Sequence, residues 1–270
     1  MFKKLSQRSK SAWCGLKLTF RWHFRRPAPR HGRSRELIVS LTSYPGRFST
    51  LHLTLKSLMT QSVRPDRVIL WLAEADRHVL PTAVEKLQRD GLEIRCCDDL
   101  LSFKKIIPTL SCYPNADIVT ADDDEYYWPD WLRELITAAE RFPGNVVAHR
   151  LHKMVFDAQG IRPYREWHKS IEGQTEDPHN IAIGCLGVFY PAGCFHPEVL
   201  NRAAFMQLCP TGDDLWLYWM VRSNGRFEIH SGSQHGQVSW HSSQKESLWN
   251  QNRNKNDIQI NAMIRTYGLP

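Results

Sequence analysis

The chain has 270 residues, of which 42% are hydrophobic, and 35 Lys or Arg against 28 Asp or Glu give it a formal net charge of +7. This is the composition of a globular protein that is large enough to bury a substantial core. The sequence has no apolar run of about 20 residues that would predict a membrane-spanning helix, no signal-peptide pattern and no zinc-binding spacing of Cys and His, which favours a cytosolic protein with reduced thiols.

The positive charge is confined to the first 35 residues, which contain eleven Lys or Arg and no Asp or Glu. The rest of the chain therefore has 35 − 11 = 24 basic residues against 28 acidic ones, a formal charge of −4. A protein that binds nucleic acid through its folded domain has basic residues across that domain. The distribution of charge therefore argues against nucleic acid as a partner.

Apolar residues in this basic tail recur close to one helical stripe: Phe2, Leu5, Trp13, Leu16, Phe20 and Phe24. Lys and Arg fill many of the other positions, a pattern typical of a helix that lies in an anionic membrane interface. A disordered basic arm is the alternative interpretation. Proline, glycine and charge at 25–35 predict a linker, so we expect a tail and linker at 1–35 and a folded domain at 36–270.

From residue 36 onward, expected strands alternate with expected helices. Apolar, β-branched runs predict strands at 36–42, 67–73, 92–97, 116–121 and 145–150. Leucine periodicity and end signals predict helices at 49–61, 81–91, 102–113 and 129–144, with a possible kink at Pro108. This alternation predicts an α/β fold with a largely parallel central sheet and helices on both faces.

The second half of the chain is less regular. Residues 150–167 predict a hairpin with a turn at 157–160, and 169–180 are polar and predict a loop. Glycines at 184, 187 and 193 allow backbone to approach a ligand closely, although strand and turn geometry is an equal explanation. Residues 247–268 predict a closing helix whose inward residues are Leu248, Ile258, Met263 and Ile264.

Three consecutive aspartates, Asp122, Asp123 and Asp124, follow the expected strand at 116–121 directly. Ligands of open parallel sheets bind outside the carboxyl ends of the strands, so these residues lie where a ligand is expected. In an extended chain Asp122 and Asp124 project to the same side and can hold a hard divalent ion such as Mg²⁺ or Mn²⁺. The alternative is an acidic surface turn with solvated charges.

Five segments, in this order, resemble the bacterial family-2-like glycosyltransferases of the glycosyltransferase A group: IVSLTSYPGRF, KSLMTQSVRPDRVILWLAE, SFKKIIPTL, ADIVTADDDEYYWPDWL and CPTGDDLWLYWM. The resemblance runs from about Leu37 to the C-terminus. It implies a glycosyltransferase A (Rossmann-like) fold, a nucleotide-sugar donor, a divalent metal that bridges the donor diphosphate, and transfer of the sugar to an acceptor hydroxyl. Residues 36–150 would then form the nucleotide-sugar-binding half and 151–270 the acceptor-binding half.

The resemblance also implies roles for the acidic residues and the loops around them. Asp122 and Asp124 are the expected metal-binding pair, Asp123 is expected to contact the donor or support the loop, and His241 is a candidate third metal ligand. Hydroxyl, aromatic and basic side chains can hold a base, a ribose and a phosphate. The candidates of this kind for donor binding are Thr42, Ser43, Tyr44, Arg47, Lys104 and Lys105. Of the two adjacent lysines we expect one to face solvent, since neighbours on a helix point to different sides.

Asp213 and Asp214 begin an expected helix with a strongly apolar face. An inverting sugar transfer needs a general base to deprotonate the acceptor hydroxyl, and the resemblance implies that this base belongs to the acidic pair. We choose Asp214 first and Asp213 second. The usual family pattern has Glu before the Asp, and this chain has Asp-Asp, so the choice within the pair stays open. Helix capping by Thr211 or Asp213 is the alternative.

Together these patterns predict an inverting, metal-dependent glycosyltransferase that builds bacterial surface glycan such as lipopolysaccharide core or capsule. It would work on the cytoplasmic side of the inner membrane, with residues 1–24 in peripheral contact with the anionic lipid surface. Two alternatives use the same residues differently. A metal-dependent phosphohydrolase acting on a nucleotide-linked substrate would turn over without an acceptor, and a non-catalytic membrane-associated binding module would show no turnover.

Overall fold

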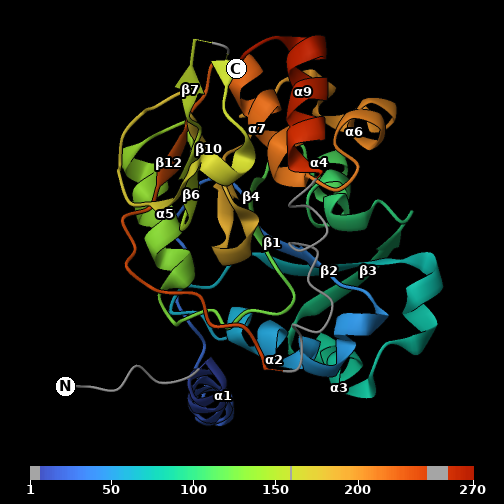
Figure 1. The fold of residues 1–270 in the computed structure, drawn as a ribbon. Helices are drawn as coiled ribbons and strands as arrows, with labels where there is room; N and C mark the ends of the chain where they lie inside the picture. The colour runs from blue at the N-terminus through green and yellow to red at the C-terminus, as the bar shows by residue number, and fades with distance from the viewer. Residues whose placement is uncertain (1–6, 159, 242–254) are drawn as a thin grey trace.

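A seven-stranded sheet lies at the centre of the structure, a computed structural model that describes residues 7–158, 160–241 and 255–270 (Figure 1). In spatial order its strands are β12 (Glu228–His230), β5 (Val146–Ala148), β11 (Val188–Tyr190), β4 (Asp117–Ala121), β1 (Leu37–Thr42), β2 (Arg67–Ala73) and β3 (Leu92–Cys97). All paired neighbours run parallel except β11, which is antiparallel to both β4 and β5. The predicted α/β class with a largely parallel sheet is therefore confirmed.

Helices cover both faces of this sheet, because its strands are apolar on both sides. On β1, Leu37, Val39 and Leu41 pack into one core and Ile38 into another. The first core also receives α2 (Phe48–Leu58), α3 (Thr82–Glu85) and α5 (Trp131–Arg141). The opposite face is covered by α4 (Ile107–Cys112), α6 (Arg202–Leu208) and α7 (Asp213–Ser223), and α9 (Asn256–Tyr267) packs on α7 (Figure 1).

Three of the expected helices differ from their predictions. The segment expected at 81–91 is the short helix α3 followed by a 3₁₀ helix, Lys86–Asp90. The segment expected at 102–113 is a 3₁₀ helix, Leu101–Lys105, followed by the separate helix α4, and the break falls at Ile106. Pro108 lies in the first turn of α4, where its missing N–H costs nothing. In α9, Met263 is buried as predicted but Ile258 is 67% exposed, and Leu248 lies outside the described residues.

Two small sheets lie beside the large one. β6 (Leu151–Lys153) is the central strand between β9 (His168–Ile171) and β10 (Asn180–Ala182). The predicted hairpin is present as β7 (Phe156–Asp157) and β8 (Gly160–Ile161). β9 falls partly within the segment that we predicted as a loop, and polar residues there gave no strand signal.

The basic tail contains a helix, α1 (Gln7–His23), so a disordered arm is ruled out for these residues. α1 packs on α2 through Leu18 and Trp22, which lie on one side of the helix. The described part of the apolar stripe faces away from the protein, with exposed fractions of 55% for Trp13, 68% for Leu16, 67% for Phe20 and 63% for Phe24. Phe2 and Leu5 lie outside the described residues. Among the described residues, none of the helices has the length and apolar character needed to cross a bilayer.

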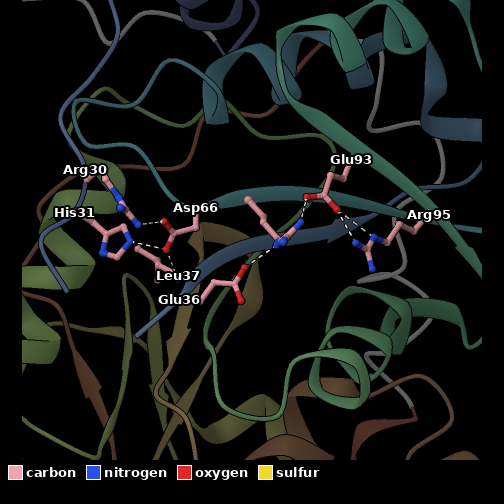
Figure 2. A network of polar contacts seen from close by, with 8 residues as sticks. Arg30, His31, Glu36, Leu37, Asp66, Glu93 and Arg95 are labelled. Carbon is pink, nitrogen blue, oxygen red and sulfur yellow. Dashed lines mark hydrogen bonds and ion pairs between the residues drawn. The ribbon is translucent and has the colours of Figure 1, made fainter. Parts of the chain in front are cut away.

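The predicted linker at 25–35 is held against the amino ends of the strands. Arg30 and His31 contact the carboxylate of Asp66 at 2.7 and 2.8 Å, and the same carboxylate accepts the Leu37 backbone N–H at 2.9 Å (Figure 2). Burial alone raises the pKa of Asp66, but the hydrogen bonds from Leu37, His31 and Arg30 outweigh it and lower the pKa to about 2. The linker is therefore fixed to the domain by charged contacts.

A second chain of ion pairs crosses the first three strands near the same edge. Arg67 contacts Glu36 at 2.6 Å and Glu93 at 2.5 Å, and Glu93 also contacts Arg95 at 2.7 Å (Figure 2). These networks occupy the edge where the parallel strands begin. The opposite edge, where the strands end, is the one that carries the acidic residues.

Candidate active site

The aspartates at 122–124 lie in a turn directly after β4, and the chain is not extended there. Thr54 on α2 holds this turn, because its hydroxyl lies 2.8 Å from the carbonyl oxygen of Asp123 and 3.1 Å from that of Glu125. The indole of Trp240 donates to the same hydroxyl at 2.9 Å. The side-to-side alternation on which we based the pairing of the first and third aspartates therefore does not apply, and each carboxylate has its own partner.

Two of these partners come from the loop after β1. The hydroxyl of Ser43 donates to the carboxylate of Asp123 at 2.5 Å. Arg47 is only 8% exposed and forms an ion pair with Asp124, which is 7% exposed. Burial alone would lower the pKa of Arg47, but Asp124 raises it. The structure thus brings this loop and the acidic turn together, as the sequence predicted.

The other two donor-binding candidates in this loop have different partners. The phenol oxygen of Tyr44 lies 3.3 Å from Nε of Arg47, so it belongs to the same group of side chains. The hydroxyl of Thr42 instead donates to the Trp71 carbonyl on β2 at 2.9 Å. This hydrogen bond supports the sheet, and a role of Thr42 in donor binding stays a prediction.

Lys105 joins the acidic turn to the start of α7. Its ammonium lies 3.1 Å from Asp122 and 3.0 Å from Asp213, and the residue is 7% exposed. Burial alone would lower the pKa of Lys105, but Asp122, Asp213 and Asp214 raise it well above its usual value. The two acidic motifs that the sequence singled out separately therefore form one site.

Lys104 lies outside this site. It forms an ion pair with Asp99, and it is only 3% exposed. The expectation that one of the two lysines faces solvent is wrong, since both are buried. The expectation that at most one belongs to the site agrees with the structure, because only Lys105 contacts the site carboxylates.

Asp214 faces the backbone of Gly184, whose N–H lies 3.2 and 3.4 Å from its two carboxylate oxygens. A Cβ at Gly184 would lie 2.9 Å from the Lys105 ammonium and 3.2 Å from Asp214, so this close approach requires glycine. Burial and the neighbouring Asp213 raise the pKa of Asp214 to about 7. The N-cap of α7 is Gly212 and no side chain caps it, so the capping alternative is wrong.

Sequence reasoning missed Glu125, the fourth acidic residue after β4. It is 1% exposed, and its Oε1 accepts hydrogen bonds from Gln237 at 2.6 Å and Ser239 at 2.7 Å. Its Oε2 is buried and has no hydrogen-bond partner among the described residues. Burial and the neighbouring Asp124 raise the pKa of Glu125 to about 8. The signal available was the unbroken acidic run at 122–125.

His241 lies at the end of a segment that runs along the acidic turn. One residue earlier, the backbone N–H of Trp240 donates to the Asp124 carbonyl at 2.9 Å. The backbone N–H of His241 donates to Ser11 on α1 at 3.3 Å, and the residue is exposed. Its role as a metal ligand stays a prediction.

Acidic side chains at 122–125, Asp213 and Asp214 outnumber the cations that pair with them among the described residues, Arg47 and Lys105. Burial and mutual repulsion raise the pKa of Asp123 and Asp214 to about 7 and that of Glu125 to about 8, so the cluster is not fully ionised at neutral pH. Across 7–158, 160–241 and 255–270, no three His, Cys, Asp or Glu side chains form a metal-binding group. Mg²⁺ is commonly held by one or two carboxylates with substrate phosphates, and oxygen donors suit it. The site therefore offers carboxylate oxygens of the kind that such an ion takes, and the assignment of Asp122 and Asp124 as its ligands stays a prediction.

Two solved structures are similar to this chain. The mannosyltransferase PcManGT from Pyrobaculum calidifontis, in complex with GDP-Man and Mn²⁺, is 16% identical with a TM-score of 0.49. That match covers 83% of this chain and 64% of PcManGT. TarS from S. aureus is 13% identical with a TM-score of 0.47, over 76% of this chain and 60% of that one. The chain thus spans less than two thirds of either structure. No protein-family model matches the sequence, and no curated protein matches it significantly.

Proposed function

We propose that the chain is an inverting, metal-dependent glycosyltransferase that moves a sugar from a nucleotide-sugar donor to an acceptor hydroxyl. The observation that carries this proposal is the position of Lys105, which links the acidic turn after β4 to the acidic start of α7. One part of the site offers oxygen donors and a guanidinium for a diphosphate. The other part offers a carboxylate whose pKa of about 7 suits a general base.

The donor is placed over the loop after β1 and the acidic turn, at the carboxyl edge of the sheet where ligands of such sheets bind. Arg47, which here pairs with Asp124, would supply a guanidinium to the donor phosphate. Asp122 and Asp124 would hold the divalent cation, which when bound supplies positive charge for the leaving diphosphate. Ser43 fixes the carboxylate of Asp123, which we assign to the donor sugar or ribose.

Asp214 acts as the general base. Its carboxylate accepts the proton of the acceptor hydroxyl while the hydroxyl oxygen forms a bond to the anomeric carbon of the donor sugar. The bond from that carbon to the donor phosphate oxygen breaks, and the nucleoside diphosphate leaves with the bonding electrons. A single displacement inverts the anomeric configuration. The Gly184 N–H fixes the base, and Lys105 holds α7 against the acidic turn.

Within this proposal, residues 36–150 bind the donor and 151–270 bind the acceptor, which we take to be a bacterial surface glycan such as lipopolysaccharide core or capsule. We assign the protein to the cytoplasmic face of the membrane. The supporting feature is α1, whose exposed apolar stripe lies opposite the side that packs on the domain. Lys10 and Lys17 beside the stripe, and the absence of acidic residues at 1–35, match an anionic lipid surface.

The membrane contact is tested by co-sedimentation with vesicles of phosphatidylcholine alone or mixed with phosphatidylglycerol. The wild-type chain should bind only the anionic vesicles, and Trp13→Ser with Phe20→Ser should abolish this binding. Leu200→Ser is the matched control, because Leu200 is 43% exposed but lies away from α1. Equal binding of all variants, or equal binding to neutral vesicles, would contradict the assignment.

The catalytic proposal is tested by release of nucleoside diphosphate from donors, with and without a panel of sugar acceptors. Asp214→Asn should lower acceptor-dependent release by about 10² to 10⁴-fold while the donor affinity stays unchanged. Asp99→Asn is the control, since Asp99 is an acidic residue that pairs with Lys104 outside the site. Full activity of Asp214→Asn would show that another residue is the base. Equal release without any acceptor would favour the phosphohydrolase.

A further inference from the structure

Two cations stand beside the base on the small sheet. Arg150 directly precedes β6, and its guanidinium lies 2.9 Å from Gln237 Oε1 and 3.4 Å from the Cys185 sulfur. Cys185 follows Gly184, whose N–H contacts Asp214. Lys169 lies on β9 and pairs with His152 of β6, two residues after Arg150. The pair therefore borders the part of the site where the proposed acceptor hydroxyl is deprotonated.

Neither cation has an acidic partner. Among the described residues, neither Arg150 nor Lys169 forms an ion pair with a carboxylate. Nε of Arg150 is buried and has no hydrogen-bond partner there. Burial and repulsion from Arg150 lower the pKa of Lys169 to about 8, although Asp257 acts in the opposite direction. Two neighbouring positive charges and an unused guanidinium donor are an arrangement that an anionic ligand would satisfy.

Aromatic rings complete the surface around Lys169. Its ammonium lies 3.2 Å from the ring centre of Tyr164 and 5.6 Å from that of Trp167. The two rings are 5.0 Å apart. Burial and the charge of Asp214 raise the pKa of Tyr164 to about 12, so this ring lies within electrostatic reach of the base. Trp167 is only 3% exposed, so of the two rings it is the partly exposed Tyr164 that can offer an apolar face and a polar edge to a ligand such as a sugar.

The backbone that carries Lys169 is irregular. Ser170, the next residue, has a φ of +53°, which is uncommon for a residue with a side chain. The register between β6 and β9 shifts between Leu151 and His152, and the Ser170 N–H donates to Nδ1 of His152 at 3.2 Å. Bulges and strained residues of this kind concentrate at functional sites, where they turn a side chain toward a ligand.

We propose that Arg150 and Lys169, with the ring of Tyr164, form an acceptor subsite for a sugar that carries an anionic group, either a phosphate or a carboxylate. The subsite rests on the proposed sugar transfer and adds the chemical class of the acceptor. The anion is held by the two cations and the sugar ring lies against Tyr164. This places a neighbouring hydroxyl of the acceptor at Asp214.

The probes are glucose 6-phosphate, glucuronate and glucose, whose binding to the full chain is measured by ligand-observed NMR and calorimetry without donor. At least one anionic sugar should bind about tenfold more tightly than glucose, since charge-assisted hydrogen bonds are stronger than neutral ones. A preference for glucose 6-phosphate identifies a phosphate, and a preference for glucuronate identifies a carboxylate. Equal affinity of all three sugars, or no binding of the anionic ones, would overturn the subsite.

The variants Arg150→Gln and Lys169→Gln should each weaken the anionic probe about tenfold and leave glucose unaffected. Lys153→Gln is the control, because it removes the same charge from β6 but Lys153 already pairs with Asp177 at 2.6 Å. If Lys153→Gln weakens binding of the anionic probe as much as Arg150→Gln and Lys169→Gln do, the effect comes from net charge and the proposed subsite is wrong. Donor-dependent thermal stabilisation, measured on the same variants, reports the proposed function separately, so failure of the subsite leaves that result intact.

Discussion

Lys105→Met removes the cation that joins the acidic turn to α7 and keeps a side chain of similar length. The ammonium has two carboxylate partners at 3.1 and 3.0 Å, and the side chain is 8% exposed. At about 3 Å and an effective dielectric constant of about 20, each pair is worth about 5 kcal/mol before the cost of desolvation. Breaking a buried pair by removing one partner typically costs about 3–5 kcal/mol. We therefore expect the free energy of unfolding to fall by about 3–5 kcal/mol.

Lys104→Met is the matched control for this experiment. The Lys104 side chain is 4% exposed, but the side chain of its partner Asp99 is 58% exposed and stays hydrated when the lysine is lost. Its removal should cost about 1 kcal/mol or less. The assay is urea unfolding of both variants at neutral pH with a chelator present, so that no bound divalent ion replaces the missing charge. Equal costs for the two variants would refute the reasoning that Lys105 holds the site together.

Three further predictions concern residues other than the proposed site residues. Asp66→Asn should lower stability by about 2 kcal/mol at pH 7 because the pKa of Asp66 is lowered to about 2 in the fold. This contribution is complete above the pKa of Asp66 in the unfolded chain and is lost as the pH falls toward 2. Urea unfolding should therefore show a smaller difference in stability between wild type and Asp66→Asn at pH 3 than at pH 7. An equal difference at the two pH values would contradict the prediction. Gly187→Ala should cost about 3 kcal/mol in the same assay, since its φ is +99° and a Cβ would lie 2.5 Å from the Trp131 ring. Gly15→Ala, in the exposed helix α1 with nothing within 4 Å, should instead stabilise the chain by about 0.5–1 kcal/mol.

Much of the fold and the position of the acidic turn follow from local patterns. Five of the seven strands are short apolar runs with clear breaks, so these strands and the largely parallel sheet were predictable, whereas β11 and β12 and the spatial order of the strands were not predicted. Asp122 had to lie at the carboxyl edge because it directly follows β4. Ser43 and Arg47 follow β1, the neighbour of β4, and so lie at the same edge. Those predictions depend on chain order alone.

The link between the acidic turn and α7 depends on packing over long sequence distances. Nothing near Lys105 in the sequence indicates that Asp213 lies 3.0 Å away, nor that Gly184 is the close neighbour of Lys105 and Asp214. The burial of Glu125 likewise depends on the segment at 237–239, which has no regular structure to predict. Pairwise charge contacts of this kind follow from the folded arrangement of several elements.

The packing of the basic tail was likewise not predictable from the sequence. The stripe that contains Trp13 and Phe20 was visible as a helical period, and it predicted an apolar face correctly. The sequence did not reveal that Leu18 and Trp22 on the opposite side attach the helix to α2. Because α1 has apolar residues on two sides, one side packs on the domain and the other stays exposed. Which side packs depends on its contacts with α2.

The central claim is that the acidic turn and the loop after β1 bind a nucleotide sugar together with a divalent ion. The most direct measurement is a thermal-shift panel of UDP-, GDP-, CMP- and dTDP-sugars, with and without Mn²⁺. A ligand that binds only the folded state raises the melting temperature. The account predicts stabilisation by one nucleotide class that requires metal and disappears in Asp124→Ala. No stabilisation by any donor, on folded protein with metal present, would contradict it and reduce the three aspartates to an acidic turn.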